Sequence, residues 1–309
     1  MENSPIRPLV SILIPSYNHA AYICTCLNSI LEDDYSNKEI IVIDDGSTDE
    51  TFDTIRLWRE MHKDKFKYPF KLIFRENRGV AKTLNELVSY ARGEYLCPIA
   101  SDDYLLPGGI EERVAYLVAN LDRKAVFGNS IVVDNKGKEI LESSIKNRRQ
   151  KKFLSNNNLI ASELIFNWCI SGPVLMVKRE VYDHTAGYDE KLVIEDWDFY
   201  LKLCARGWLG FIDFPVGAYR VHDKNTCHNS QVWMKSKESQ YFCVSNNYFY
   251  FTGLNKWNLY AKKLILQSKV GNDKDNLLKR YVYLSIGRNL NQITKWLYKI
   301  KRLFYLFRL

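Results

Sequence analysis

Long hydrophobic runs are missing from this sequence of 309 residues. No uninterrupted apolar stretch approaches the ~20 residues that a membrane-spanning helix needs, and the opening MENSPIRPL lacks the apolar segment of a signal peptide. Glycine and proline are also sparse, with 15 and 8 residues, while 46% of all residues are hydrophobic. Collagen-like, low-complexity and disordered classes are therefore excluded. We expect a globular, cytoplasmic protein with one large domain and an extension.

Paired cysteine motifs and glycine-rich nucleotide motifs are absent as well. The seven cysteines are an odd number without metal-ligand spacing, which excludes a zinc framework or a disulfide scaffold and predicts reduced, mostly buried thiols. No Gly-x-Gly-x-x-Gly follows the first apolar run, and no Gly-Lys-Ser/Thr loop occurs anywhere. Nicotinamide-dependent enzymes and P-loop enzymes are therefore excluded.

Acidic residues are nearly missing from the C-terminal quarter. Residues 226–309 contain 15 Lys or Arg and 3 acidic residues, a net charge of +12, whereas residues 1–225 carry a net charge of −4. This difference predicts two domains: a catalytic domain over residues 1–225, and a basic, aromatic-rich helical region over residues 226–309 that meets an anionic surface.

Short β-branched runs alternate with amphipathic stretches in the first half of the chain. Strands are predicted at residues 9–14, 39–44, 71–75, 94–100 and 125–133, and helices at 20–32, 49–61, 80–91 and 109–121. Ser47 or Thr48 can cap the second helix, with Asp49 and Glu50 in its first turn. The alternation predicts an α/β fold whose mostly parallel sheet is covered by helices on both faces.

Polar and acidic residues follow four of the predicted strands. They occupy residues 15–18, 44–47, 76–79 and 101–103. The carboxyl ends of parallel strands share one edge of a sheet, and ligands bind at that edge. Carboxylates repel a nucleotide diphosphate unless a divalent cation lies between them, so Asp102 and Asp103 predict a Mg²⁺ or Mn²⁺ site. A solvated turn is the alternative for such a pair.

Seven segments taken in order carry a family resemblance. They are SILIPSYNHAAYI, IVIDDGSTDET, ENRGVAKTLNEL, ASDDYLLPGG, AGYDE, EDWDFYLKL and YRVH. With these segments, residues 8–225 resemble the inverting family 2 glycosyltransferases of the bacterial polysaccharide and lipid-linked oligosaccharide type. The resemblance implies the nucleotide-sugar-binding GT-A fold, here with a C-terminal helical extension.

The resemblance also implies which residues hold the donor. Pro15, Tyr17 and Asn18 line the base, while Asp45 or its neighbour Asp44 accepts a hydrogen bond from the uracil or ribose. A turn and helix cap is the alternative for residues 44–47. The remaining implied donor-binding residues are Arg78, Lys82, Ser101, Asp102, Gly172 and Arg220.

The implied metal ligands depart from the family's pattern in one position. Many members have Asp-x-Asp-Asp where this chain has Ala100 to Asp103, so the first acid is absent. The metal role falls on Asp102 or Asp103, and the sequence does not say which. His222 corresponds to a residue that approaches the metal or pyrophosphate in relatives; a structural or surface histidine is the alternative.

The family's Glu-Asp motif implies that Asp196 is the catalytic base, with Glu195 and Asp198 in support. Such a base removes the proton from an acceptor hydroxyl. Acids that cap a helix N-terminus are the alternative interpretation. The neighbouring Trp197 either stacks on an acceptor ring or packs in the interior.

The C-terminal segment has the pattern of an interfacial helix. Its apolar residues fall on one helical face and its basic residues on the opposite face. The apolar set is Ile293, Leu297, Ile300, Phe304 and Phe307, and the basic set is Lys295, Lys299 and Arg302. This pattern predicts peripheral attachment to the inner face of the cell membrane; packing onto the catalytic domain and a homodimer contact are the alternatives. No nucleic-acid recognition motif accompanies the charge. A second basic stretch, residues 146–152, is predicted to be a loop.

These features together predict an inverting, metal-dependent hexosyltransferase. It moves a hexose or N-acetylhexosamine from a UDP-sugar to a glycan acceptor, a lipid-linked oligosaccharide of the O-antigen, capsule or N-glycan precursor type. Two alternatives remain: a sugar-nucleotide-binding module without transfer activity, and a pyrophosphorylase-like nucleotidyltransferase. The nucleotidyltransferase needs a Gly-rich, Arg-containing loop after the first strand, and PSYNHA does not supply one.

Overall fold

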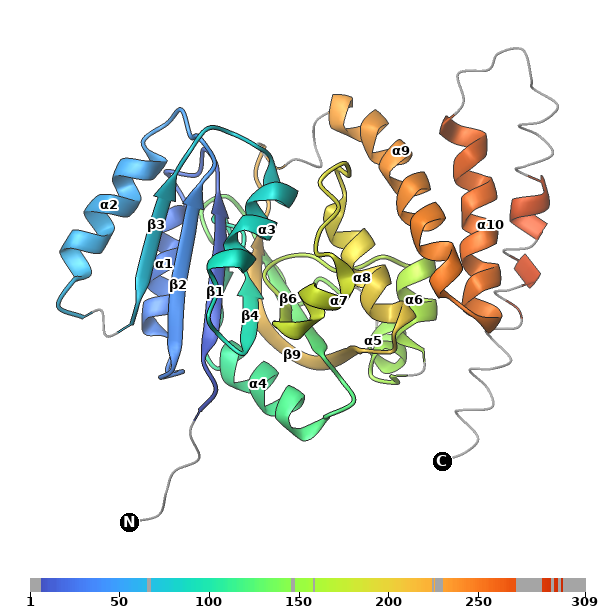
Figure 1. Cartoon of the computed structure of the whole chain (residues 1–309), viewed down its shortest axis with the longest axis horizontal. Coiled ribbons are helices and arrows are strands. Elements are labelled where there is room, and N and C mark those ends of the chain that lie inside the picture. The colour runs from blue at the N-terminus through green and yellow to red at the C-terminus, as the bar shows by residue number, and fades with distance from the viewer. Residues whose placement is uncertain are drawn as a thin grey trace. The chain divides into compact units, whose positions relative to one another are not determined.

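The computed structural model describes residues 7–65, 68–145, 148–157, 159–223, 225, 230–270, 285–289, 292–293 and 296 (Figure 1). The chain divides into two compact units. Unit 1 comprises Met1–Ser155, Cys169–Glu190 and Trp208–His222, and unit 2 comprises Asn156–Trp168, Lys191–Gly207 and Asp223–Leu309. The first 225 residues therefore contribute to both units, and the functional division at residue 225 stays a prediction.

Unit 1 is built on a sheet whose nine strands all lie in the described residues. The strand order is β3-β2-β1-β4-β8-β6-β9-β5, and β7 pairs with β6. The strands are β1 (Val10–Ser16), β2 (Lys38–Asp44), β3 (Phe70–Phe74), β4 (Tyr95–Pro98), β5 (Tyr104–Leu105), β6 (Ala125–Val133), β7 (Glu139–Leu141), β8 (Leu175–Lys178) and β9 (Leu209–Arg220). Strands β3, β2, β1 and β4 run parallel, so their carboxyl ends meet at one edge.

Helices cover both faces of the parallel half of this sheet (Figure 1). The helices of unit 1 are α1 (Ile23–Glu32), α2 (Thr51–His62), α3 (Val80–Tyr90), α4 (Gly109–Ala119), α5 (Arg148–Leu154) and α7 (Glu180–Thr185). Side chains of α1, α2 and α4 form one hydrophobic core with Val10, Ile12 and Ile14 of β1. Helix α3 contacts β1 and β2 and supplies its own buried side chains, including Leu84 and Leu87. Every residue of β2 is buried, as expected for a strand covered on both sides.

The predicted α/β fold with flanking helices is confirmed, and the predicted strands and helices begin and end within a few residues of the observed ones. Three details differ. The sheet is mixed, because β8 pairs antiparallel with β4 and β6. Neither Ser47 nor Thr48 caps α2; Asp49 accepts the Thr51 N–H instead. The basic stretch expected to be a loop contains α5 from residue 148 onward.

Unit 2 is helical. Its described elements are α6 (Ile160–Phe166), α8 (Glu195–Ala205), α9 (Ser230–Asn247), the 3-10 helix η2 (Tyr248–Tyr250) and α10 (Gly253–Val270). Helix α8 contacts α6 and α9, and α10 contacts α6 and α9. Buried side chains fill the space between them, among them Leu164, Phe199, Val244 and Leu259. The predicted C-terminal helical extension is therefore present.

Helices able to cross a bilayer do not occur among the described residues. Most of the predicted interfacial stripe, including Leu297, Ile300, Phe304 and Phe307, lies outside the described residues. Two residues of that segment, Ile293 and Trp296, are described, and both side chains are exposed.

Candidate active site

The loops that follow β1 and β2 are joined to each other at the edge of the sheet. The Asn18 N–H donates to Ser47 Oγ at 2.9 Å, and Asn18 Oδ1 accepts the Thr48 N–H at 2.8 Å. Asn18 has a left-handed backbone (φ 54°), which asparagine tolerates better than most residues. Asn18 thus fixes the shape of this edge. Tyr17 beside it is exposed, and Pro15 is half-buried.

The two carboxylates after β2 hold the neighbouring loops together. Asp44 is fully buried, and Asp44 Oδ1 accepts the Ser47 N–H at 2.7 Å; burial raises the pKa of Asp44. Asp45 forms an ion pair with Arg75 and accepts the N–H groups of Arg78 and Gly79 at 2.8 and 2.9 Å. The Asp44 contact is that of the turn interpretation, whereas the Asp45 contacts join the end of β2 to residues 75–79. The side chains of Arg78 and Lys82, in contrast, are exposed.

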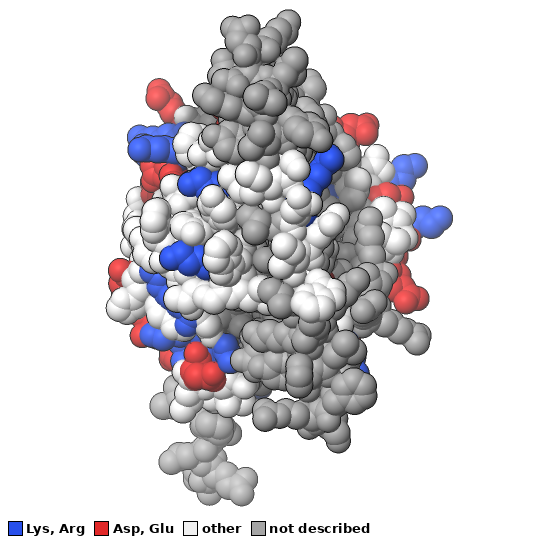
Figure 2. Space-filling model, turned by 90° about the vertical axis from the view of Figure 1, so that its right-hand side faces the viewer, with Lys and Arg blue, Asp and Glu red and all other residues white. Residues whose placement is uncertain are grey.

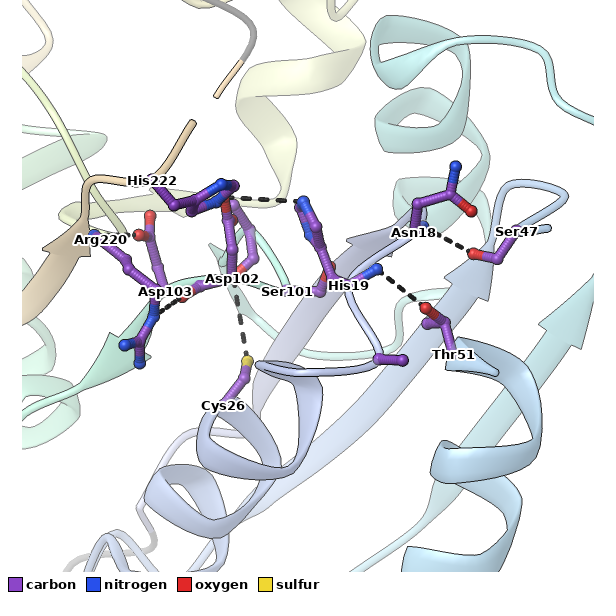
Figure 3. Close-up of polar contacts among 12 residues, drawn as sticks. Asn18, His19, Cys26, Ser47, Thr51, Ser101, Asp102, Asp103, Arg220 and His222 are labelled. Carbon is purple, nitrogen blue, oxygen red and sulfur yellow. Dashed lines mark hydrogen bonds and ion pairs between the residues drawn. The ribbon is translucent and has the colours of Figure 1, made fainter. Parts of the chain in front are cut away.

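Three side chains that can bind a metal converge at the same edge (Figure 3). His222 Nε2 lies 3.0 Å from Asp102 Oδ2, and His19 Nε2 lies 3.8 Å from the same oxygen. All three ligand atoms are within 4.8 Å of one another. One carboxylate and two imidazoles form a donor set that suits a divalent cation such as Mn²⁺. The structure therefore brings the predicted residues Asp102 and His222 together and adds His19.

Asp103 and Arg220 belong to the support of this cluster. Asp103 is buried, and its Oδ1 accepts the Arg220 N–H at 2.8 Å. Burial, together with the charge of Asp102, raises the pKa of Asp103 well above its ordinary value. Arg220 is also buried; its Nε donates to the Asp102 carbonyl at 2.8 Å, and its guanidinium lies over the ring of Tyr22. These contacts hold residues 102–103 against the end of β9.

Gly172 has a structural reason to be glycine. Its φ is +80°, and a Cβ there would lie 2.9 Å from Tyr219 Cβ. A side chain at residue 172 would therefore meet β9 in a conformation that L-residues rarely adopt. The resemblance implies that Gly172 binds the donor; its close neighbour in the structure is Tyr219.

In unit 2, the predicted base lies at the N-terminus of α8. Asp196 Oδ1 accepts the Trp197 N–H at 2.7 Å. Desolvation by the surrounding protein raises the pKa of Asp196. Desolvation, with the charge of Asp196 as a second cause, raises the pKa of Glu195 to about 8. With a pKa of about 8, Glu195 keeps its proton at neutral pH.

The residues after Asp196 anchor α8 in unit 2. Asp198 is buried; its carboxylate pairs with Lys202 at 2.9 Å and accepts from Asn247 Nδ2 at 2.7 Å. Trp197 is only 4% exposed, and the Lys262 ammonium lies 4.1 Å from the centre of its ring. Lys262 also donates to the Ile165 carbonyl at 2.6 Å. Trp197 thus packs in the interior of unit 2, as the packing alternative predicted.

A family model matches the chain over residues 11–184, more than half of its length, and its description is Glycosyl transferase family 2. The chain belongs to this glycosyltransferase family. The family predicted from the seven segments is thereby confirmed.

One curated protein is similar to this glycosyltransferase over most of the length of the chain. The chondroitin synthase of Escherichia coli is 27% identical over 251 residues, which cover 81% of this chain but 34% of that protein. The chain thus spans about a third of the length of this curated relative.

Two solved structures support the GT-A fold. S. aureus TarS 1-349 in complex with UDP has a TM-score of 0.62 at 20% identity, covering 87% of this chain and 75% of that chain. The mannosyltransferase PcManGT of Pyrobaculum calidifontis, in complex with GDP-Man and Mn²⁺, has a TM-score of 0.56 at 21% identity, covering 97% and 88%.

Three residues that contact the predicted site residues within their own units were not predicted. His19 directly follows the polar segment of residues 15–18, so its place beside the ligand edge was a usable signal. Arg75 ends the third predicted strand next to that edge. Lys262 had no local signal, because its partners Trp197 and Ile165 are distant in the sequence.

Proposed function

We propose that this protein is an inverting glycosyltransferase that uses a UDP-sugar and a divalent metal ion. The observation that carries the proposal is the cluster of His19, Asp102 and His222 at the ligand edge of a family 2 sheet. Arg78 and Lys82, exposed after β3, would meet the donor phosphates, and Tyr17 the base. When bound, the cation would offset the charge that develops on the diphosphate leaving group.

Asp196 is the proposed general base. Its raised pKa brings it nearer to the working pH, where a base is most effective. It removes the proton of an acceptor hydroxyl, whose oxygen attacks the anomeric carbon from the face opposite the nucleotide, so the configuration inverts. We place the donor machinery and the base within residues 1–225, and membrane attachment in residues 226–309.

The proposed acceptor is a glycan on a lipid carrier, reached from the surface of a membrane. Support comes from exposed aromatic side chains in unit 2: Phe249 is 76% exposed and Trp257 57%. Lys256 lies between them in the chain, and residues 226–309 carry a net charge of +12. In the view of Figure 2, Lys and Arg lie among uncharged residues, with Asp and Glu beside them toward the margins. Aromatic and basic side chains together favour an anionic lipid surface.

A panel of UDP-sugars and GDP-sugars, each with Mn²⁺, with Mg²⁺ or with a chelator, tests the proposed reaction. We expect release of UDP that requires a metal and is lost in Asp102→Asn. Donor binding without UDP release would favour the binding-module alternative. Pyrophosphate release from UTP and a sugar 1-phosphate would favour the nucleotidyltransferase. Turnover of GDP-sugars alone would overturn the choice of nucleotide.

A further inference from the structure

The candidate metal site contains a second histidine. His19 follows β1, Asp102 follows β4 and His222 follows β9, so the three come from separate parts of unit 1 (Figure 3). We infer that His19 is a third protein ligand of the metal ion, and that the resulting two-imidazole site selects Mn²⁺ over Mg²⁺. The inference rests on the proposed function in that the cation is the one that would meet the donor diphosphate.

The surroundings of His19 orient its ring toward Asp102. The His19 N–H donates to Thr51 Oγ1 at 2.8 Å, which fixes the backbone. His19 Nδ1 lies 2.8 Å from the hydroxyl of Ser101, which is fully buried. With the proton on Nδ1, this hydrogen bond directs the Nε2 lone pair toward the carboxylate. Metal-binding histidines are commonly oriented by such a bond from the second ring nitrogen.

The distances within the cluster fit three ligands of one cation. His222 Nε2, at 3.0 Å from Asp102 Oδ2, is at hydrogen-bond distance. His19 Nε2, at 3.8 Å, is too far for a hydrogen bond to that oxygen, although it faces it. Two ligands of one ion, each about 2.1 Å from the metal, lie about 3 to 4 Å apart. Both separations therefore suit ligation of a shared cation.

The donor set decides which cation this site prefers. Mg²⁺ is a hard ion that takes oxygen ligands and gives up its water reluctantly. Imidazole favours first-row transition metals, whose affinity for nitrogen exceeds that of Mg²⁺. A site with only Asp102 and His222 offers one imidazole, whereas the addition of His19 makes two of the three protein ligands nitrogen donors. We therefore expect binding of Mn²⁺ without any nucleotide, because three ligands are supplied by the protein itself.

The experiment uses the full-length protein with Mn²⁺ alone. Pulsed EPR detects the ¹⁴N nuclei of coordinated imidazole, and calorimetry gives the dissociation constants of Mn²⁺ and Mg²⁺. Wild type should show two coordinated imidazoles, and His19→Gln and His222→Gln one each. Each substitution should weaken Mn²⁺ binding at least ~10-fold, the scale found when the surroundings of metal ligands are altered. His184→Gln, exposed on α7 and outside the cluster, is the matched control.

A further variant tests selectivity directly. His19→Glu replaces an imidazole by a carboxylate of similar reach, so the preference for Mn²⁺ over Mg²⁺ should shrink while Mg²⁺ affinity rises. Circular dichroism melting curves of each variant report whether the fold is retained. A variant that does not fold is replaced by His19→Asn, with the same expectation as for His19→Gln.

Several results would overturn the inference. They are a single imidazole signal in wild type, unchanged Mn²⁺ binding in His19→Gln, or no Mn²⁺ binding in the absence of nucleotide. UDP-sugar hydrolysis by wild type, measured separately, distinguishes this failure from failure of the proposed function. If the wild type hydrolyses UDP-sugars and metal binding does not depend on His19, only the assignment of His19 as a ligand is wrong. If Mn²⁺ is bound by two imidazoles but no nucleotide sugar is hydrolysed, only the proposed transferase function is wrong.

Discussion

At the scale of single residues, the neighbours Glu195 and Asp196 both have a raised pKa. Burial and the adjacent charge raise the pKa of Glu195 to about 8, and desolvation raises that of Asp196. Two like charges at adjacent positions do not ionise independently, so a charge on one carboxyl opposes loss of the proton from the other. With a pKa of about 8, Glu195 is protonated at neutral pH and adds no second negative charge beside Asp196.

The substitution Asp196→Asn tests the base. Asparagine keeps the shape of the side chain but cannot accept the hydroxyl proton, so turnover should fall by ~10² or more while donor affinity is retained. Steady-state kinetics and calorimetry with the donor measure the two effects. Asp183→Asn, an exposed acid on α7, is the control. Near-normal turnover in Asp196→Asn, or loss of donor binding, would remove Asp196 from the role of base.

The substitution Glu195→Gln tests the raised pKa. The folded protein holds the Glu195 proton up to about pH 8, whereas an unfolded chain loses it near the ordinary glutamate pKa of 4.5. The unfolded state therefore binds fewer protons between these values, and the stability contributed by the neutral carboxyl is lost as the pH rises from about 4.5 to 8.

Glutamine does not titrate, so Glu195→Gln removes the loss of stability that titration of Glu195 causes. The free energy of unfolding should fall less between pH 5 and pH 8 in Glu195→Gln than in wild type, as measured by urea denaturation. Glu238→Gln, an exposed acid of α9, should keep the wild-type slope. Identical slopes in Glu195→Gln and wild type would show that Glu195 titrates normally.

At the scale of secondary-structure elements, α8 is held by its neighbours at several points. Asp198 joins α8 to α9 through Asn247, and Lys262 joins α10 to Trp197 of α8 and to the end of α6. Burial lowers the pKa of Lys262 to about 8. The helix that carries the proposed base thus depends on polar contacts in the core of unit 2. Such contacts are costly to leave unsatisfied.

Lys262→Met should change how stability depends on pH. In wild type, the folded protein loses the Lys262 proton above about pH 8 while the unfolded chain keeps it until about pH 10.5. Stability should therefore rise over this interval, by on the order of 1–3 kcal/mol. Urea denaturation at pH 7.5 and pH 9.5 should show this rise in wild type and in the neighbouring control Lys263→Met. A rise of equal size in Lys262→Met would contradict the assignment.

At the scale of the whole molecule, charge is divided unevenly along the chain. The first 225 residues are mildly acidic, whereas residues 226–309 are strongly basic. The described part of this basic region exposes aromatic side chains at Phe249, Tyr250 and Trp257. A surface of this kind is attracted to anionic lipid by charge and held there by apolar burial.

Removal of residues 279–309 tests membrane attachment. The truncated protein should sediment less with anionic vesicles, and its activity on a lipid-linked acceptor should fall more than its UDP-sugar hydrolysis. Binding of the intact protein should also weaken as salt is raised, because screening reduces the electrostatic attraction. Vesicle sedimentation over a salt series measures both effects, with neutral vesicles as the control. If the intact protein stays in the supernatant at low salt, and truncation changes its oligomeric state, the segment is a subunit contact.

The sequence by itself determined the order of strands and helices in unit 1 and the edge at which polar residues gather. Both follow from local patterns: β-branched runs and helical periodicity set the elements, and parallel strands bring their carboxyl ends together. The family could be predicted from seven short segments, because each segment is a local stretch of sequence that can be recognised without the fold. Asp102 and His222 could be chosen as candidate metal ligands because they lie in two of these segments.

Only the tertiary structure decided which of these side chains meet. Ser101 is 82 residues from His19, and His222 is 120 residues from Asp102, so their contacts depend on how separate strands pack and not on any local pattern. The same holds for Asp45, whose carboxylate meets Arg75 and the loop after β3, and for Lys262 under Trp197. Sequence patterns report which elements form and which edge they share. The direction of each side chain at that edge is set by packing across elements, because neighbours distant in the chain determine which hydrogen bonds and ligands it can reach.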